Sequence, residues 1–103
     1  MTLFDRVAPS GPDVTRRTMF GFPAAFVNGN LCCGTFHDQL MLRLPEDARA
    51  ELETLGGTPF APMSGRPMKG YMSIAPQVFA DESVLRAWLE RAATFTRTLP
   101  AKK

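Results

Sequence analysis

The sequence predicts an α+β fold of two layers, in which an antiparallel sheet of about five strands carries its helices on one face. Asn28-Gly29 separates two apolar runs and is typical of a type I′ hairpin turn. Residues 39–44 repeat leucine with a period of two, and the large apolar residues over 85–95 have helical spacing. Because hairpins dominate this order, we expect an antiparallel sheet.

Length and composition indicate a single domain over residues 1–103. With 103 residues, 45% hydrophobic and 21% charged, the chain lies in the ordinary globular range. It has no apolar run of the about 18 residues that a membrane helix needs, and its first residues do not resemble an export signal. Two adjacent cysteines without such a signal predict a reducing cytoplasm. The net charge of +2 is low for a dedicated nucleic-acid-binding surface.

Residues 1–13 are expected to form a loosely structured lead-in to the sheet. Leu3, Phe4 and Val7 can share one side of a short helix. The prolines and glycine that follow break the chain before it enters the first strand, since neither residue type continues a helix well.

Two turns determine the predicted register of the first three strands, one at Asn28-Gly29 and one at His37-Asp38. The predicted pairs are Phe26 with Leu31, Ala24 with Cys33, and Cys33 with Leu42. The predicted core face consists of Phe22, Ala24, Phe26, Leu31, Cys33, Leu40, Leu42 and Leu44. Both turns agree on this face, and a slip of one residue would turn a strand inside out.

A helix and a weak strand are predicted next. Pro45 opens the helix, where its missing N–H has no consequence, and Gly56-Gly57 ends it. The predicted apolar stripe of this helix is Ala48, Leu52 and Leu55. Residues 58–62 are expected to be an edge strand, because proline has no N–H to donate to a neighbouring strand and is therefore found at sheet edges.

The last part of the chain is predicted to be a strand over residues 68–75 and a long helix. In the strand, Met68, Met72 and Ile74 share one face, and Lys69 and Tyr71 share the other. Asp81 or Ser83 caps the helix, and Pro100 stops it. The predicted apolar stripe of the helix is Leu85, Trp88, Leu89, Ala92 and Phe95, with Leu99 continuing it.

Cys32 and His37 come nearest to a catalytic or metal-binding pattern, and neither completes one. Neighbours on a strand point to opposite faces, so Cys33 is expected in the core and Cys32 outside, opposite Arg43, whose charge would favour a thiolate. About 13 Å of extended chain separates Cys33 from His37, too far for a catalytic dyad. One His and two divergent Cys do not make a structural zinc site, and no phosphate-binding loop occurs. We therefore expect no catalytic residue, cofactor or metal.

Arg66, Lys69 and Tyr71, together with Arg43, form the predicted interaction surface. A turn presents Arg66, and strand parity directs Lys69 and Tyr71 to the face of the sheet that no helix covers. Arg43 projects to the same side if its strand belongs to the same sheet. Tyrosine and arginine are enriched at binding hot spots. The alternative is that these cations only solubilise a hairpin.

The leading hypothesis is a non-enzymatic regulatory or adaptor domain that binds a protein partner through the open sheet face. The outward apolar residues Ala25, Cys32, Phe36 and Met41 also favour a homodimer. Direct nucleic-acid binding is the first alternative, although Tyr71 and Phe36 provide few rings for base stacking. The second is an uncharacterised enzyme or ligand-binding protein with a pocket between the sheet and the final helix.

Gly-Arg-Pro-Met-Lys-Gly-Tyr, at residues 65–71, is the most distinctive motif of the sequence. The other segments that accompany it, in order, are residues 15–21, 27–30, 33–34, 40–44, 88–92 and 97–100. Together, over about residues 14–100, they resemble the TfoX N-terminal domain family.

This resemblance implies a two-layer α+β domain with an antiparallel sheet, similar in topology to secretion chaperones, in a bacterial cytoplasmic protein. The namesakes of the family regulate natural competence genes, whereas many members are stand-alone domains of unknown function. The family supplies no established catalytic residues. Its members usually begin with a longer helix than residues 1–13 allow, and its namesakes carry a second, C-terminal domain. A stand-alone member of the family is therefore expected.

Overall fold

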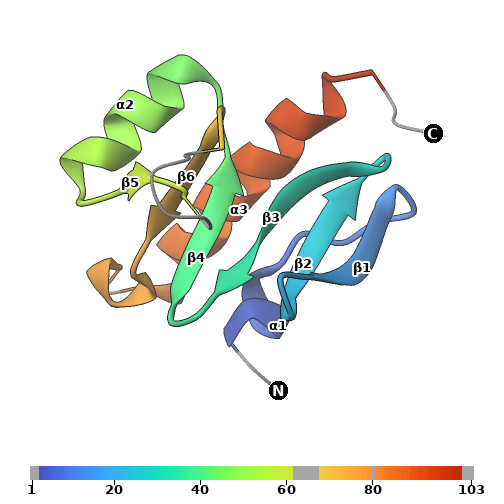
Figure 1. The fold of residues 1–103 in the computed structure, drawn as a ribbon, viewed down its shortest axis with the longest axis horizontal. Coiled ribbons are helices and arrows are strands. Elements are labelled where there is room, and N and C mark those ends of the chain that lie inside the picture. Colours follow the sequence, from blue (N-terminus) through green and yellow to red (C-terminus); the bar gives the residue numbers. More distant parts are fainter. Residues whose placement is uncertain (1–2, 62–67, 80, 101–103) are drawn as a thin grey trace.

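The computed structural model describes residues 3–61, 68–79 and 81–100, and its strands form one sheet (Figure 1). Neighbouring strands are antiparallel, and their order is β1-β2-β3-β4-β6-β5. The strands are β1 (Val14–Met19), β2 (Phe22–Val27), β3 (Asn30–Phe36), β4 (Gln39–Arg43), β5 (Thr58–Pro59) and β6 (Tyr71–Ile74). The helices are α1 (Leu3–Val7), α2 (Glu46–Thr54) and α3 (Glu82–Arg97), with a 3₁₀ turn at Pro76–Val78.

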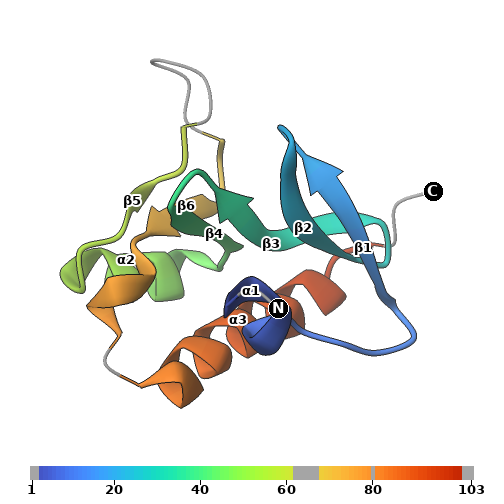
Figure 2. The ribbon, with the colours of Figure 1, turned by 90° about the horizontal axis from the view of Figure 1, so that it is seen from below.

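The three helices lie on one face of the sheet (Figure 2). Their apolar side chains join those of the strands in one buried core. This confirms the predicted α+β fold, but the described residues form a sheet of six strands rather than about five. The additional strand, β1, pairs with β2 through a turn at Phe20-Gly21. Both turn residues have positive φ, 55° and 81°, as do Asn28-Gly29 in the predicted turn that follows.

The segment before the sheet contains the short helix that the sequence predicts. α1 is the predicted short helix, and Phe4 and Val7 are buried on its inner side. The Arg6 side chain donates a hydrogen bond to Glu82 of α3, with Nε and Oε1 3.0 Å apart. The apolar burial and this ion pair hold α1 against α3.

α2 and α3 bury most of the predicted apolar stripes. The Asp81 carboxylate accepts a hydrogen bond from the Ser83 amide at 2.9 Å, which confirms Asp81 as the cap of α3 and lowers the pKa of its carboxyl. Leu55 was wrongly placed in the α2 stripe: the helix ends before it, and its side chain is 43% exposed. The buried helical residues are Ala48 and Leu52 in α2, and Leu85, Trp88, Leu89, Ala92, Ala93 and Thr96 in α3. None of the described helices has the length and apolarity needed to cross a membrane.

A β-bulge between β2 and β3 changes part of the predicted register. The pair at the hairpin tip is as predicted, but beyond it the partner of Cys33 is Ala25 and not Ala24. Cys32 is the extra residue of the bulge. The prediction holds again further along, where Cys33 pairs with Leu42 of β4. As a result, Cys32 and Cys33 both lie in the core and are fully buried.

The bulge also exchanges the two faces of β2. Ala25 and Val27 point into the helix-covered core, whereas Ala24 and Phe26 lie on the opposite face with Leu31. The predicted core face is therefore wrong for β2 and for Leu31, because one extra residue reverses the alternation of a strand. It is correct for β4, whose leucines are in the core.

β6 is shorter than predicted, because Gly70 changes the course of the chain before it. Gly70 has a φ of 89°, so regular alternation begins only at Tyr71. Met72 faces the core as predicted, whereas Met68 packs on the opposite face beside Tyr71, which corrects the prediction for Met68. The predicted edge strand is β5, which pairs with β6.

The face opposite the helices, which we call the open face, carries a second apolar cluster. Its buried members are Ala24, Leu31, Met41, Phe60 and Tyr71, and Met19, Phe26, Phe36 and Met68 are half-buried around them. Phe60 follows β5 and is held by two backbone hydrogen bonds, to the Tyr71 carbonyl at 3.1 Å and from the Met68 amide at 2.7 Å. These bonds place the Phe60 ring on the open face.

Gly34 is a position in the sheet where a methyl group has no room. A Cβ there would lie 3.0 Å from both the Ala24 Cβ and the Pro23 carbonyl oxygen. We expect Gly34→Ala to lower the free energy of unfolding, measured by urea denaturation, by about 1–3 kcal/mol. Because one of the two contacts is the Ala24 side chain, adding Ala24→Gly should restore part of the loss. Equal stability of Gly34→Ala and wild type would contradict this packing.

Candidate interaction surface

The structure describes three of the four residues predicted to form the interaction surface. Arg66 lies outside the described residues. Lys69 is exposed, but Arg43 is half-buried and Tyr71 is only 8% exposed. Arg43 and Tyr71 are direct neighbours across β4 and β6, as their predicted common face requires.

Tyr71 is held in place by hydrogen bonds at both sides of its hydroxyl. The hydroxyl donates to the Leu31 carbonyl oxygen at 3.0 Å and accepts from Arg43 Nη1 at 3.2 Å. The Arg43 guanidinium also lies 5.3 Å from the centre of the Tyr71 ring. Burial raises the pKa of the Tyr71 hydroxyl, and the charge of Arg43 opposes that shift. Arg43 and Tyr71 therefore join β3, β4 and β6, and Lys69 is the described member of the set that remains exposed.

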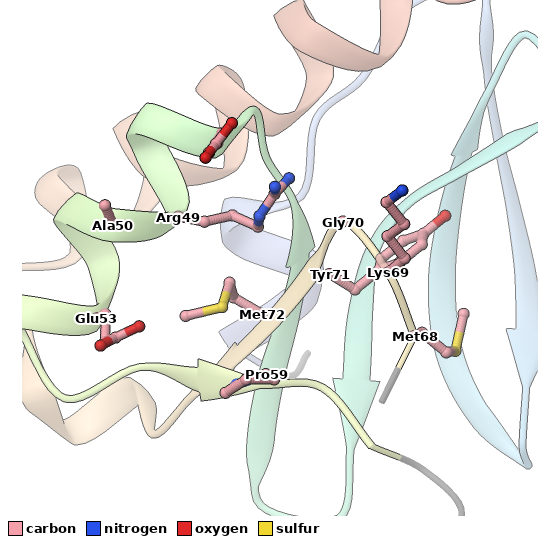
Figure 3. Close-up of a pocket in the computed structure, with 10 residues that line it drawn as sticks. Arg49, Ala50, Glu53, Pro59, Met68, Lys69, Gly70, Tyr71 and Met72 are labelled. Atoms are coloured by element: carbon pink, nitrogen blue, oxygen red, sulfur yellow. The ribbon is translucent and has the colours of Figure 1, made fainter. Parts of the chain in front are cut away.

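A groove of 470 Å³ runs between α2 and the segment that leads into β6 (Figure 3). Its walls include Met68, Lys69 and Gly70 on one side and Glu46 and Glu53 of α2 on the other. Cations and carboxylates thus line the same groove, and no single sign of charge dominates it.

Arg49 is a residue of this groove that the sequence analysis missed. It extends from α2 toward the strands (Figure 3), and its Nη1 donates to the Leu44 carbonyl oxygen at 2.6 Å. A Cβ at Gly70 would lie 4.0 Å from the same nitrogen, so the arginine passes close to the Gly70 backbone. The sequence feature that could have identified Arg49 is its position beside the apolar stripe of the helix, one residue after Ala48 and three before Leu52.

Aromatic rings gather at one end of the sheet. We call the rings of Phe20, Phe22, Phe36, His37 and Phe60 the aromatic cluster. The Phe36 ring centre lies 5.7 Å from that of Phe20, 5.4 Å from that of Phe22 and 5.4 Å from that of Phe60. The Phe20 side chain is 48% exposed although it is a large apolar group. Sequence reasoning missed this cluster, because Phe20-Gly21 was not recognised as a turn.

The charges of the sheet all have one sign. None of the six strands in the described part of the chain contains Asp or Glu, and their charged residues are Arg16, Arg17 and Arg43. Arg16 pairs with Asp5 of α1 at 2.7 Å. The Arg17 guanidinium lies 5.8 Å from the centre of the Phe26 ring. The open face is therefore apolar with cations at its borders.

The fold and the motif agree with one family of proteins, whose sequence profile, the TfoX N-terminal domain, matches residues 5–96. The chain belongs to this family. The match spans nearly the whole chain and confirms the resemblance predicted from the motif at residues 65–71. The TfoX N-terminal domain family is not a known family of enzymes. No curated protein shows significant similarity to the chain.

In this TfoX N-terminal domain, Cys32 does not occupy the outer position predicted for it. The bulge turns it into the core, away from Arg43, whose guanidinium bonds to Tyr71 instead. The adjacent Cys32 thiol and burial raise the pKa of Cys33. His37 lies in the predicted turn, with a positive φ of 56°, and its ring packs 4.5 Å from the Phe36 ring. Among the described residues, no three His, Cys, Asp or Glu side chains are grouped as metal ligands.

The residues that predicted a homodimer are not a surface of this TfoX N-terminal domain. Ala25 and Cys32 are in the helix-covered core, and Met41 is 2% exposed on the open face. Phe36 is half-buried within the aromatic cluster. Among the described residues, the exposed large apolar side chains are Phe20, Leu55, Val78 and Val84. Of these, Phe20 is the one that belongs to the aromatic cluster.

Both cysteines are expected to be unreactive in the folded protein. Each side chain is fully buried, so an alkylating reagent has no access to either sulfur. Treatment with iodoacetamide at pH 7.5 should leave the native chain unmodified and alkylate both thiols in about 6 M guanidinium chloride, as measured by mass spectrometry. Rapid alkylation of Cys32 under native conditions would show that its side chain lies outside the core.

Tyr71→Phe is expected to lower the free energy of unfolding by about 1–2 kcal/mol at pH 7, because the Leu31 carbonyl loses its donor. Burial raises the pKa of Tyr71 in the folded protein, so the unfolded chain ionises first as the pH rises above about 10. Wild type therefore loses stability in that range, and its advantage over the variant should shrink. Urea denaturation at a series of pH values tests this.

Tyr71 is the only tyrosine of the chain, so tyrosinate absorbance follows its titration directly. An unshifted titration midpoint in the folded protein, or a variant as stable as wild type at pH 7, would contradict the assignment of a buried, hydrogen-bonded hydroxyl.

Proposed function

We propose that this TfoX N-terminal domain is a non-enzymatic regulatory or adaptor domain that binds a protein partner through its open face. The family's competence regulators support a regulatory role. A cytoplasmic location in a bacterium fits two thiols that form no disulfide. A single domain fits one sheet shared by all the described strands.

The observation that carries this proposal is the exposed side chain of Phe20. It is 48% exposed and lies at the tip of the β1–β2 hairpin, with the rings of Phe36 and Phe60 packed beneath it. Contiguous exposed apolar groups on a small domain mark sites of protein contact. Lys69 and Arg17 are both exposed and are charged groups that a partner can contact.

The packing of the core argues against a ligand pocket between the sheet and α3. Leu42, Trp88 and Leu89 belong to the core there and are at most 6% exposed. Side chains at that degree of burial leave little space for a substrate. The groove beside α2 has mixed charges and one of its cations, Arg49, already bonds to the Leu44 carbonyl.

Nucleic acid is the second candidate, and the acid-free sheet is the observation that favours it. Binding of single strands needs ring faces on which bases can stack and several cations for phosphates. In the aromatic cluster, Phe36 packs against Phe20 at 79° and against Phe60 at 84°, and it is half-buried, which limits its access to a stacking base. Arg43 is engaged with Tyr71. These contacts make a protein partner the better fit.

Phe20→Ser is expected to weaken partner binding by at least about fivefold, since a truncated aromatic anchor usually costs more than 1 kcal/mol. Tagged wild-type and variant proteins would be used to capture partners from the cytosol of the source bacterium, with quantitative mass spectrometry as the readout. Val84→Ser is the matched control, because Val84 is 47% exposed but lies on α3. It should retain the wild-type partners.

The same partners in equal amounts with all three proteins would sink the proposal. Each variant is checked by urea denaturation, so that loss of binding is not confused with loss of fold. A mobility shift of single-stranded DNA at low salt, abolished by Lys69→Glu with Arg17→Glu, would favour nucleic-acid binding in its place.

A further inference from the structure

β1 forms one edge of the sheet, and its outer side has no neighbouring strand in the described part of the chain. In Figure 1 it is the outermost strand, at the end of the sheet away from α2. Thr15, Arg16, Arg17 and Thr18 are all exposed. Exposed edge strands are the places where an extended segment of another chain adds to a sheet.

The backbone groups of Arg16 and Thr18 face this open edge. In an antiparallel pair, alternate residues direct their N–H and C=O groups toward the partner strand. Thr18 lies opposite Pro23, whose carbonyl accepts a hydrogen bond from Thr35 Oγ1 of β3 at 3.2 Å and so points away from β1. The backbone N–H and C=O groups of Thr18, and those of Arg16 two residues before it, therefore point away from β2. Within the described residues no turn or loop backbone bonds to them.

Side-chain charge decides which strand this edge accepts. The two central residues are Arg16 and Arg17, and among the described residues no ion pair involves Arg17. Arg17 lies opposite Ala24 and therefore projects on the open face, whereas Arg16 projects on the other face, toward Asp5. If two copies paired through β1 about their centres, arginines would oppose arginines, which destabilises a sheet.

We propose that the β1 edge binds an acidic peptide segment in an extended conformation, which adds to the sheet as a seventh strand. The segment's backbone completes the hydrogen bonds of Arg16 and Thr18. Its carboxylates lie on the open face beside Arg17, where no strand of the sheet carries an acidic residue. On the other face Asp5 already neutralises Arg16, so polar uncharged side chains fit there.

This inference goes beyond the proposed function, because it concerns the backbone of an edge strand rather than the aromatic cluster. Partner capture that depends on Phe20 tests the proposed function, and binding of a peptide to β1 tests this inference. Either result can fail without the other.

The test uses the full chain and a synthetic peptide of alternating glutamate and threonine, about eight residues long to span β1. Amide exchange and amide chemical shifts, measured by NMR, should show protection of Arg16 and Thr18 when the peptide is added. The same peptide methylated on alternate backbone nitrogens keeps its charge but cannot pair on one edge. A peptide with lysine in place of glutamate keeps the pairing groups but reverses the charge.

Two substitutions in β1 separate backbone pairing from charge. Thr18→Pro removes the N–H at the open edge, where proline is tolerated, and should abolish peptide binding. Thr18→Ala keeps the N–H and is its matched control, with binding close to wild type. Arg17→Glu should weaken binding of the acidic peptide about tenfold and improve binding of the lysine peptide.

Several outcomes would overturn the inference. One is equal binding of the acidic, lysine and N-methylated peptides. Another is a set of shifts at α2 and Lys69 with none in β1. A third is a dimer in light scattering that Thr18→Pro dissociates, since a second copy would then occupy the edge. Tighter binding of single-stranded DNA than of the acidic peptide at the same residues would replace the peptide with a nucleic acid. The N-methylated peptide keeps the test decisive even if Thr18→Pro does not fold.

Discussion

The bulge at Cys32 is the constraint on which the two faces of the sheet depend. One extra residue in β3 reverses the alternation of the chain before it, so Leu31 and Cys33 lie on opposite faces although both are apolar. The helix-covered core thereby receives two small cysteines, both fully buried. The open face receives Leu31 with Phe26, and becomes a second apolar cluster rather than a solvated surface.

That exchange of faces also changes what the family motif does. The Tyr71 side chain lies on the open face with that of Leu31, its hydroxyl donates to the Leu31 carbonyl, and Arg43 completes the contact from β4. A buried tyrosine whose hydroxyl is bonded on both sides stabilises the sheet and offers little to a partner. The motif is thus mostly structural in its described part. Gly70 has a positive φ and its backbone lies close to the Arg49 side chain, and Tyr71 connects three strands. Of the described members of the motif, only Lys69 is exposed.

Charge and apolar surface are distributed unevenly between the two layers. The strands carry arginines and no carboxylates, whereas α2 is rich in glutamate and aspartate on its exposed side. An apolar face bordered by cations suits a partner with apolar and acidic groups. The β1 edge likewise favours an acidic segment as the strand with which it pairs. The exposed ring of Phe20 and the edge strand are adjacent along the chain, so one partner can contact both.

The sequence alone predicts the fold class, the hairpin turns at Asn28-Gly29 and His37-Asp38, the core face of β4, most of the apolar stripes of α2 and α3, and the family. These follow from local signals, because turn stereochemistry and helical or twofold periodicity depend on residues close together in the chain. Tertiary contacts determine the bulge, the strand at Val14–Met19 and the burial of Tyr71. A bulge cannot be recognised from the sequence pattern when apolar residues fill both faces. Phe20 adopts a positive φ that its side chain does not favour, so its turn depends on the pairing of β1 with β2.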